Sequence, residues 1–585
     1  MPQLTDADRI ARAEAWIAQD PDTETRTELA AIVARVREGD AAAAADLADR
    51  FDARLAFGTA GLRGEIAAGP NRMNRVLVSQ GAAGLAAYLG STATGDVAPS
   101  VVIGYDGRRN SEVFARDVAE VMAGAGVRAV LLPRLLPTPV LAFAVRHLDT
   151  SAGVMITASH NPPNDNGMKV YLGGVDQGSQ IVAPADADIA AQIDRVAATT
   201  PVTELPRGGY ETADESVVEA YVAATTAVAS APAAQPRVVY TAMHGVGWET
   251  MRRVLEAAGF ATPSLVGEQI EPDGRFPTVA FPNPEEPGAM DLSFAAARAV
   301  GADLVIANDP DADRLAIAVP DAADPEGFRR LTGNEVGLLL GWQVAEQVAN
   351  GAVAAPTAGA TDASAPADAG AGAGAASGTL ACSIVSSPGL EAIARAHGLG
   401  FRATLTGFKW ISRAPGLVFG FEEALGYLVN PGTVRDKDGI SAAVAFLSLA
   451  ARLAAEGRTI ADRLDELALR FGCFDSTQVS IRVTDLSRIA DVMARLRAEP
   501  PAEVGGIRVE RIDDLAAGID GYPPSDVLRL VLDGGARVMV RPSGTEPKLK
   551  VYIDAAATEG TLEERRAAAS DAVSRLEAGM RALVA

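Results

Sequence analysis

Short apolar runs alternate with longer, helix-like patterns over most of this chain. Between about residues 75 and 220, strand-like runs such as Val101–Ile103 alternate with helical stretches such as 111–125. A second cycle of this kind runs from Arg237 to Ala307, and a third occupies about 330 to 465. Such alternation is typical of βαβ units, in which parallel strands are covered by helices. The pattern therefore predicts three successive α/β units.

Both ends of the chain follow other patterns. Residues 6–50 have a helical periodicity and are rich in alanine and in charged residues. The C-terminal part mixes strand patterns with a final helix, at 478–483, 527–532, 537–541 and 561–583. This mixture is of the α+β type, so we expect a separate C-terminal domain.

One stretch fits no element. Residues 351–378 consist almost entirely of Ala, Gly, Thr, Ser, Pro and Asp. Such a composition cannot bury enough apolar surface to offset the entropy lost on ordering. We interpret the stretch as a disordered loop inserted between a helix at 334–349 and a strand at 380–385. With the proline-containing connectors at 201–206 and 231–236 as further guides, the expected domains are 1–230, 231–325, 326–470 and 471–585.

Length and charge narrow the possible functions. A chain of 585 residues is too long for a single core, and roughly three to five domains are expected. The net charge of −23 argues against nucleic acid or an anionic membrane as a partner, because phosphate groups are met by basic surfaces. Small anionic ligands stay possible, since a cleft can hold local positive charge on an acidic protein. No apolar run reaches about 18 residues and no leader pattern begins the chain, so we expect a cytoplasmic protein.

A serine beside a histidine lies in the most informative segment. Ser159 and His160 come shortly after the apolar run Gly153–Ile156, which predicts a strand. The prolines at 162 and 163 force the residue before them out of the helical region, so Ser159 is expected on a loop at a strand end. Sheet proteins often carry their chemistry on such loops. A purely structural Ser-His pair is the alternative.

Three carboxylates alternate in a second loop. Asp309, Asp311 and Asp313 directly follow the strand pattern at 303–307. Packed together without a cation, they would repel one another and raise one another's pKa. An all-oxygen ligand set favours Mg²⁺ over softer metals. The glycine and the final glutamate of an EF-hand are absent, so the loop predicts another kind of magnesium site, with a solvated acidic turn as the alternative.

A third loop offers acceptors for hydroxyl groups. Glu422 and Glu423 lie between glycines and aromatic residues in the segment 419–427. Adjacent carboxylates suit the vicinal hydroxyls of a sugar, and aromatic walls are common in such sites. Downstream, Lys437 stands between two aspartates. It either meets a phosphate or pairs with these two acids.

The fourth loop is suited to an anion. It supplies a guanidinium, two hydroxyls and a glycine backbone from Arg541, Ser543, Gly544 and Thr545, with Lys548 close behind. The Gly-Lys-Ser/Thr of a Walker loop is absent, and so is the Gly-x-Ser-x-Gly elbow of an esterase. Together the four loops offer a nucleophile, a hard cation, hydroxyl acceptors and a phosphate site. This combination predicts phosphoryl transfer on a phosphorylated polyol.

In these four motifs and their order, the chain resembles the α-D-phosphohexomutase superfamily, most of all the branch that holds phosphoglucomutases and phosphopentomutases. The resemblance extends to residues 20–26 and 57–64 and covers nearly the whole chain apart from the insertion at 351–378. It implies an α/β fold of three similar α/β domains with mixed sheets, plus a smaller C-terminal α+β domain, around a central cleft. In that family the C-terminal domain can move.

The resemblance also implies roles for residues. Ser159 would carry a phosphate, and an oxygen of this phosphoserine would join Asp309, Asp311 and Asp313 in binding Mg²⁺. His160 matches a histidine implicated in acid/base work, while Arg63 and Lys169 match basic residues near the transferred phosphoryl group. To these catalytic candidates we add Lys437. The residues implied or suggested to bind the substrate are Thr406, Gly407, Lys409, Glu422, Glu423, Arg541, Ser543, Gly544, Thr545 and Lys548.

The predicted activity is that of a phosphosugar mutase. It would move a phosphoryl group between C1 and C6 of a hexose phosphate, glucose 1-phosphate and glucose 6-phosphate, through a phosphoserine and a bisphosphate intermediate. The implied cofactors are Mg²⁺ and glucose 1,6-bisphosphate, the latter as an activator. The expected partners are small sugar phosphates, with no nucleic acid and no membrane, and the expected state is a monomer.

One departure from the family pattern keeps other substrates open. Phosphoglucose and phosphomannose mutases usually carry a serine two residues after the sugar-loop glutamate, and here that position is Ala424. Members that resemble mammalian phosphopentomutase tolerate alanine there. A phosphopentomutase acting on ribose or deoxyribose 1- and 5-phosphate is therefore the main alternative. A phosphomannomutase, a serine-dependent sugar phosphatase and a non-catalytic sugar-phosphate-binding protein are the others.

Overall fold

The computed structural model describes residues 4–93, 98–353, 378–483, 487–519, 521–542 and 548–584. The chain divides into two compact units. Unit 1 comprises Met1–Arg330 and Gly426–Ala451, and unit 2 comprises Leu331–Leu425 and Arg452–Ala585. Most of the predicted insertion, residues 354–377, lies outside the described residues.

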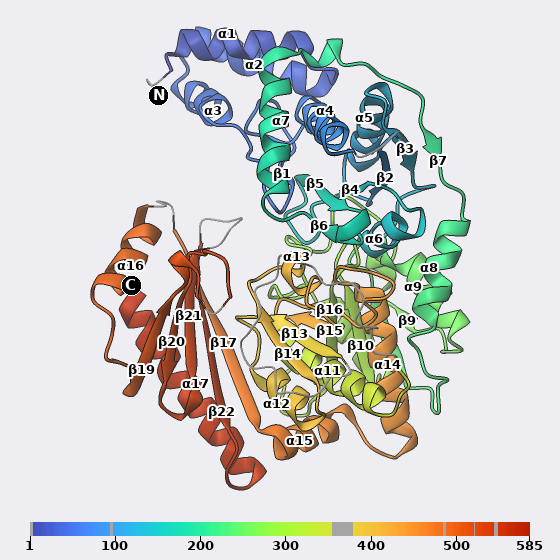
Figure 1. The fold of residues 1–585 in the computed structure, drawn as a ribbon, viewed down its shortest axis with the longest axis vertical. Coiled ribbons are helices and arrows are strands. Elements are labelled where there is room, and N and C mark those ends of the chain that lie inside the picture. The colour runs from blue at the N-terminus through green and yellow to red at the C-terminus, as the bar shows by residue number, and fades with distance from the viewer. Residues whose placement is uncertain are drawn as a thin grey trace. The chain divides into compact units, whose positions relative to one another are not determined.

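The helical pattern at 6–50 forms three helices at the start of unit 1. They are α1 (Asp6–Gln19), α2 (Thr23–Arg37) and α3 (Ala41–Phe51), drawn in dark blue in Figure 1. Each begins after a residue whose side chain accepts a hydrogen bond from the first turn, namely Thr5, Asp22 or Asp40. Their apolar faces join the core of the sheet that follows.

The first sheet of unit 1 is mixed. Its strand order is β1-β5-β4-β2-β3-β7, with β6 paired to β5. The strands are β1 (Leu62–Glu65), β2 (Ser100–Tyr105), β3 (Arg128–Leu131), β4 (Ala152–Ile156), β5 (Asp165–Leu172), β6 (Ser179–Gln180) and β7 (Glu211–Thr212). β2, β3, β4 and β7 are parallel neighbours, whereas β5 pairs antiparallel with β4 and with β1.

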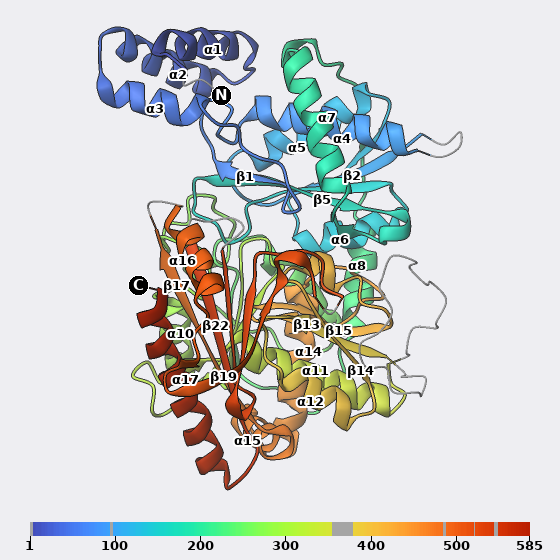
Figure 2. The ribbon, with the colours of Figure 1, turned by 60° about the vertical axis from the view of Figure 1, so that its left-hand side comes forward.

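Helices cover both faces of this sheet. Figure 2 shows α4 (Arg75–Thr92) and α5 (Ser111–Gly124) on one side of it and α6 (Thr138–His147) on the other. α4 packs against both α5 and α7 (Ala185–Thr199), and α6 packs on β2 and β4. Every residue of β4 is consequently buried, which explains why its sequence is continuously apolar.

The register of the parallel strands decides where the Ser159 loop begins. β2 and β4 pair so that Tyr105 lies opposite Ile156, the last residue of each strand. The carboxyl ends of the two strands therefore meet at one edge of the sheet. The loops that follow them, at 106–110 and 157–164, begin side by side.

The second sheet of unit 1 positions the aspartate loop in the same way. Its order is β12-β11-β10-β8-β9. The strands are β8 (Val238–Thr241), β9 (Ser264–Leu265), β10 (Leu304–Asn308), β11 (Leu315–Pro320) and β12 (Phe328–Arg330). β8 and β10 are parallel, with Thr241 opposite Ala307, and β10 is entirely buried. The three aspartates thus follow the carboxyl end of a central strand.

Further elements complete unit 1. The helices α8 (Ser216–Thr226), α9 (Gly247–Ala257) and α10 (Asp291–Val300) accompany the second sheet. The short strand β16 (Gly426–Leu428) meets the aspartate loop through a bridge between Gly426 and Arg314. α14 (Gly439–Ala455) begins in this unit, right after the segment that contains Lys437.

Unit 2 begins with a third α/β part. Its sheet places β13 (Thr379–Ser383) between β14 (Gly400–Thr404) and β15 (Leu417–Glu422), with both pairings parallel. The helices are α11 (Gly333–Ala349), α12 (Gly389–Ala396), α13 (Phe408–Ile411) and α15 (Ile460–Phe471). α11 begins with a capping box in which the side chains of Thr332 and Glu335 each accept the other's backbone N–H.

The C-terminal part of unit 2 is an antiparallel sheet with two helices. Its order is β17-β22-β21-β20-β19-β18, seen in orange and red in Figure 1. The strands are β17 (Cys473–Arg482), β18 (Glu503–Val504), β19 (Ile507–Asp514), β20 (Leu528–Leu532), β21 (Arg537–Pro542) and β22 (Lys548–Ala557), and the helices are α16 (Ser487–Ala498) and α17 (Leu562–Val584). Burial alternates along β20, as expected for a sheet with one covered face.

The predicted fold class is confirmed: three α/β parts precede a C-terminal α+β part. The predicted boundaries of the four domains and the central cleft stay predictions. In the described part of the chain, no single helix is long and apolar enough to cross a membrane, and only α14 and α15 taken together meet the length and composition required.

Candidate active site

The hydroxyl of Ser159 points at the aspartate loop of the neighbouring sheet in unit 1. Its Oγ donates a hydrogen bond of 2.8 Å to Asp309 Oδ2, across 150 positions of sequence. Ser159 is 2% exposed, and its backbone N–H donates to Thr157 Oγ1 at 2.8 Å. Its φ of +51° lies in the left-handed region, which residues other than glycine adopt at a cost. The loop therefore holds a buried hydroxyl in one defined direction.

The three aspartates converge on one point. Asp309, Asp311 and Asp313 are completely buried, and one oxygen of each lies within 4.8 Å of the others. The loop turns sharply at Ala312, whose φ is +53° and whose N–H donates to the carbonyl of Asp309 at 2.8 Å. The backbone N–H of Arg314 donates to Asp309 Oδ1 at 2.9 Å. The alternation seen in the sequence thus becomes a compact cluster of carboxylates.

Two ammonium groups and one hydroxyl face this cluster. Lys169 Nζ lies 2.8 Å from Asp311 Oδ2 and 2.9 Å from Asp313 Oδ2. Lys437 Nζ lies 2.8 Å from Asp313 Oδ2. Thr138, the first residue of α6, donates its hydroxyl to Asp311 Oδ2 at 2.6 Å. In a buried site of low effective dielectric these contacts offset much of the repulsion among the carboxylates.

The surroundings shift the pKa values of these carboxyl groups in opposite directions. Burial, followed by the charges of Asp311 and Asp313, raises the pKa of Asp309 well above its usual range. Burial also acts to raise the pKa of Asp313, but the charges of Lys169 and Lys437 outweigh it and hold that pKa far below the usual range. The cluster is therefore least balanced at Asp309, where burial and the two neighbouring carboxylates act in the same direction.

The donor set fits a hard divalent cation. All three side chains offer oxygen, which suits Mg²⁺ better than softer metals. Oδ1 of Asp311 and Oδ1 of Asp313 are buried, and neither accepts a hydrogen bond from any described residue. A buried acceptor without a donor is costly, and a cation relieves that cost. The cluster is thus a candidate magnesium site.

His160 and Arg63 border the Ser159 loop. His160 Nδ1 lies 3.2 Å from Ser159 Oγ. Desolvation, followed by the charges of Arg314 and Arg63, lowers the pKa of His160 well below its usual range, so the ring is neutral at pH 7. Arg63 lies on β1 and donates Nη1 to Asn161 Oδ1 at 3.1 Å. The structure thus brings both candidates to the serine, while their catalytic roles stay predictions.

The two aspartates that flank Lys437 accept hydrogen bonds from side chains of other segments. Asp436 Oδ2 accepts from Tyr171 Oη at 3.0 Å and from Gln180 Nε2 at 2.7 Å. Asp438 accepts from Tyr221 Oη at 3.0 Å and caps the first turn of α14 through backbone N–H groups. The sequence left open whether Lys437 meets a phosphate or pairs with these acids. In the structure its ammonium group pairs with Asp313, and a contact with a phosphate stays a prediction.

Several substrate-binding candidates meet within unit 2. Glu422 Oε1 accepts from the backbone N–H of Gly407 at 2.6 Å, so the end of β15 holds the turn that begins α13. The φ of Gly407 is +112°, which favours glycine there. Thr406 Oγ1 accepts from Arg541 Nη1 at 2.8 Å. These contacts link the sugar-loop candidates to the first residue of the predicted phosphate loop.

The other substrate-binding candidates of unit 2 make separate contacts, and three of them lie outside the described residues. Glu423 is half-buried, and its Oε2 accepts from the hydroxyls of Ser383 and Ser386 at 3.0 Å each; its role in sugar binding stays a prediction. Lys409 belongs to α13, and Lys548 begins β22 opposite Arg482. The predicted residues that lie outside the described part are Ser543, Gly544 and Thr545.

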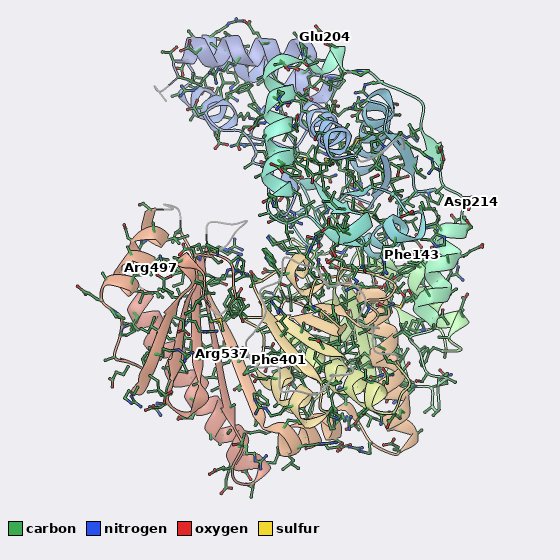
Figure 3. All side chains as sticks on the ribbon, in the orientation of Figure 1. Phe143, Glu204, Asp214, Phe401, Arg497 and Arg537 are labelled. Atoms are coloured by element: carbon green, nitrogen blue, oxygen red, sulfur yellow. The ribbon has the colours of Figure 1, made fainter. Side chains whose placement is uncertain are left out.

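The C-terminal sheet is fastened to the third α/β part inside unit 2. Arg537 on β21 pairs with Asp554 at 2.9 Å and donates Nη2 to the carbonyl of Ser386. An apolar cluster accompanies this contact and consists of Ile384, Val385, Leu515, Val527, Met539 and Tyr552. Figure 3 labels Arg537 on the C-terminal sheet and Phe401 on β14. The strand that leads into the predicted phosphate loop is thus anchored.

Sequence reasoning missed Thr138 and the partners of the segment around Lys437. Thr138 carried only a weak signal, a hydroxyl residue between two prolines at the start of a helix. Tyr171, Gln180 and Tyr221 carried none, because each lies more than two hundred positions from the aspartate it contacts. Only the fold brings these residues to Asp436 and Asp438.

Four family models match this chain, in order and over most of its length. They describe the phosphoglucomutase/phosphomannomutase alpha/beta/alpha domains I, II and III, at residues 54–200, 219–322 and 366–471, and the C-terminal domain at 479–572. A solved structure with a similar fold is that of a phosphoglucomutase/phosphomannomutase family protein from Burkholderia thailandensis. Its TM-score is 0.65 at 20% sequence identity, and the match covers 91% of this chain and 97% of that one.

Curated relatives carry three different substrate names. A protein of Haemophilus influenzae described as a probable phosphomannomutase is 53% identical over 83% of this chain and 93% of its own length. The phosphopentomutase of Mus musculus is 34% identical over 87% and 85%, respectively. A phosphoglucomutase of Staphylococcus epidermidis is 34% identical over 85% and 90%. These relatives agree on mutase chemistry with sugar phosphates and differ in the sugar.

The environment of Asp438 predicts a pH dependence of stability. Burial raises its pKa to about 6, although hydrogen bonds from Ser441 and Tyr221 oppose the shift. Between about pH 4 and pH 6 the unfolded chain has lost this proton while the native chain keeps it, so wild-type stability falls as the pH rises through this window. Asp438→Asn keeps the helix cap and does not titrate. The difference in the free energy of unfolding, variant minus wild type, should therefore increase from pH 4 to pH 6 and stay constant above pH 6.

Urea unfolding of both proteins from pH 4 to 8 measures this difference. Asp194→Asn, which removes an exposed carboxylate on α7, controls for the loss of one negative charge. A difference between Asp438→Asn and the wild type that does not change with pH would contradict the assignment.

Proposed function

This chain belongs to the phosphoglucomutase/phosphomannomutase family, and we propose that it interconverts glucose 1-phosphate and glucose 6-phosphate through a phosphorylated Ser159 and a bisphosphate intermediate. Members of the family are mutases, enzymes that move a phosphoryl group within a sugar phosphate. The observation that carries the proposal is the 2.8 Å hydrogen bond from Ser159 Oγ to the buried carboxylate cluster. It puts a nucleophilic hydroxyl beside a site for a hard cation, the pairing that phosphoryl transfer needs.

Mannose phosphate is the second candidate substrate. Its support is the 53% identity to the Haemophilus influenzae protein described as a probable phosphomannomutase. A pentose phosphate is favoured by a different observation, the alanine at position 424 together with the similarity to mouse phosphopentomutase. A direct comparison of sugars decides among the three.

Asp309, Asp311 and Asp313 would hold Mg²⁺, together with an oxygen of phosphorylated Ser159. When bound, the ion offsets negative charge on the oxygens of the phosphoryl group. Lys169 and Lys437 already contact the same carboxylates and add positive charge at this point. The two lysines therefore place local positive charge where a dianionic group would bind, on an otherwise acidic protein.

In the proposed step, the bond between phosphorus and Ser159 Oγ breaks while a bond forms between phosphorus and a sugar hydroxyl oxygen. The proton of that hydroxyl ends on Ser159 Oγ. His160 is the proposed carrier, because its Nδ1 lies 3.2 Å from Oγ and its ring, neutral at pH 7, has a nitrogen without a proton. Arg63 would add positive charge beside the Ser159 loop.

The resulting bisphosphate must turn around, so that its second phosphate faces Ser159. Arg541, with Ser543, Gly544, Thr545 and Lys548, is the proposed site for whichever phosphate is not reacting. A guanidinium and backbone donors recognise a phosphate whatever sugar carries it. Thr406, Gly407, Lys409 and Glu422 are proposed to orient the sugar, and glucose 1,6-bisphosphate to renew the phosphoserine.

A phosphatase is the rival enzyme, since water could attack the phosphoserine in place of a sugar. The burial of the serine argues for the mutase: Ser159 is 2% exposed, and its neighbour Asp309 is completely buried. Exclusion of water protects a reactive phosphoester from hydrolysis. A mutase therefore converts its substrate without net release of inorganic phosphate.

The proposal predicts the outcome of a substrate comparison. With Mg²⁺ and a trace of glucose 1,6-bisphosphate, the protein should convert glucose 1-phosphate with a higher kcat/KM than mannose 1-phosphate, ribose 1-phosphate or deoxyribose 1-phosphate. Ser159→Ala should lower turnover of all four by about 10⁴-fold or more, because it removes the nucleophile. Ser91→Ala, which removes an exposed hydroxyl on α4, serves as the matched control and should leave turnover unchanged.

Each other outcome has a defined meaning. Full turnover by Ser159→Ala would end the proposal. Release of inorganic phosphate in step with substrate loss would identify a phosphatase. A higher kcat/KM for mannose 1-phosphate or for a pentose phosphate would transfer the assignment to that sugar.

The aspartate cluster predicts a loss of metal binding on substitution. Asp311→Asn removes one charged ligand and should weaken Mg²⁺ binding by at least about tenfold. The measurement is calorimetric titration with Mg²⁺, backed by the rise in melting temperature that bound metal produces. The exposed Asp194→Asn is the matched control and should bind as the wild type does. Unchanged Mg²⁺ affinity in Asp311→Asn would remove the cluster from the metal site.

A further inference from the structure

One buried side chain, that of Arg108, contacts the backbone of the Ser159 loop at several points. Arg108 comes shortly after β2, and its side chain is completely buried. Its Nη2 donates to the carbonyl of Ser159 at 2.5 Å and to that of Asn161 at 2.7 Å. Its Nη1 donates to the carbonyl of Pro162 at 2.8 Å and to that of Asp165 at 3.1 Å. One guanidinium thus binds four carbonyl oxygens of one loop.

Arg108 is itself fixed in place. Its Nε lies 3.7 Å from the buried carboxylate of Asp106, and its guanidinium carbon lies 4.9 Å from the centre of the Phe276 ring. Asp106 accepts from Arg108 N–H at 3.0 Å and from the hydroxyls of Ser111 and Thr157 at 2.6 Å each. The anchor is therefore part of a polar network at the end of β2, in which both terminal nitrogens of Arg108 and both carboxylate oxygens of Asp106 are hydrogen-bonded. Hydrogen bonds of this kind, made in a buried site, hold the groups that they join in place.

The same network reaches the backbone of the serine. Thr157 Oγ1 donates to Asp106 and also accepts from Ser159 N–H at 2.8 Å. Ser159 is thereby held at its N–H through Thr157 and at its carbonyl by Arg108. These two contacts fix the residue in the left-handed conformation, with φ of +51°, in which its hydroxyl reaches Asp309. A strained backbone of this kind persists only where its surroundings over-determine it.

We propose that Arg108 is a positioning residue for phosphoryl transfer, which holds the Ser159 hydroxyl on the aspartate cluster without contacting the reacting atoms. The proposal rests on the proposed function of Ser159. A lysine cannot replace Arg108, because one ammonium group lacks the planar fork that serves four carbonyls at once. Loss of the fork should therefore let Ser159 relax from its strained conformation. Substrate binding should be spared, since Arg108 contacts only backbone oxygens of the loop.

Arg108→Lys tests this in the full-length protein, with two readouts. Steady-state kinetics with glucose 1-phosphate should show kcat lower by about 100-fold, the usual effect of a nucleophile displaced by about 1 Å. The KM should stay within about threefold of the wild-type value, because the contacts that bind the substrate are unchanged. Hydrogen–deuterium exchange should show the amides of residues 157–165 exchanging faster by a factor of about ten. Arg109→Ala, which alters the exposed neighbouring arginine, is the matched control and should change neither readout.

A second variant covers the case in which Arg108→Lys does not fold. Thr157→Val keeps the shape of the side chain and removes the hydroxyl that ties Asp106 to Ser159 N–H. It should show the same fall in kcat with little change in KM and the same faster exchange of the loop. If a folded variant, Arg108→Lys or Thr157→Val, keeps the wild-type kcat or the wild-type exchange rate of the loop, the positioning role is wrong.

The two readouts separate this proposal from the proposed function. Loop exchange is measured on the protein without substrate, so it reports on the Arg108 contacts even where no sugar is converted. A wild-type protein without mutase turnover would overturn the proposed function. Loop exchange that is unchanged in the variants would overturn the role of Arg108 whether or not turnover is observed.

Discussion

Three carboxylates buried at one point are the constraint on which the rest of the site depends. Asp309, Asp311 and Asp313 are completely buried within 4.8 Å of one another, an arrangement that is unfavourable without positive charge. Lys169 and Lys437 supply part of that charge, while Oδ1 of Asp311 and Oδ1 of Asp313 stay buried without a hydrogen-bond donor among the described residues. A hard cation satisfies the remainder, and Ser159 is the hydroxyl that this cluster orients.

The fold meets this constraint through strand register. In the first sheet β4 ends beside β2, and in the second β10 ends beside β8, so the serine loop and the aspartate loop each begin at the carboxyl edge of parallel strands. β5 carries Lys169 back beside β4, and the segment before α14 brings Lys437 to the same carboxylates. Three segments distant in sequence, at 159–169, 309–313 and around Lys437, thus meet at one site within unit 1. The α-D-phosphohexomutase resemblance noted from the motifs agrees with the family that the chain belongs to.

Local pattern was sufficient to predict much of this architecture. The apolar runs at 153–156 and 303–307 became the buried strands β4 and β10, because a strand covered on both faces reads as continuously apolar. The loops after them were recognisable by their prolines and carboxylates. The local pattern could not predict which residues each side chain of the site would contact. Glu423 is a sugar-binding candidate from its position, and the two serines that donate to its Oε2 could not be predicted, because only the fold brings them near. Arg108 gave no signal either, because its role depends on carbonyl oxygens more than fifty positions away.

The central claim is that Ser159 stores a phosphoryl group and passes it to a sugar rather than to water. Peptide mass spectrometry after incubation with glucose 1,6-bisphosphate, followed by a chase with glucose 1-phosphate, measures this most directly. The account predicts one phosphate on the peptide that contains Ser159, which the chase transfers to the sugar without release of inorganic phosphate. A phosphate found on another residue, or one that appears as inorganic phosphate at the rate at which it leaves Ser159, would contradict it.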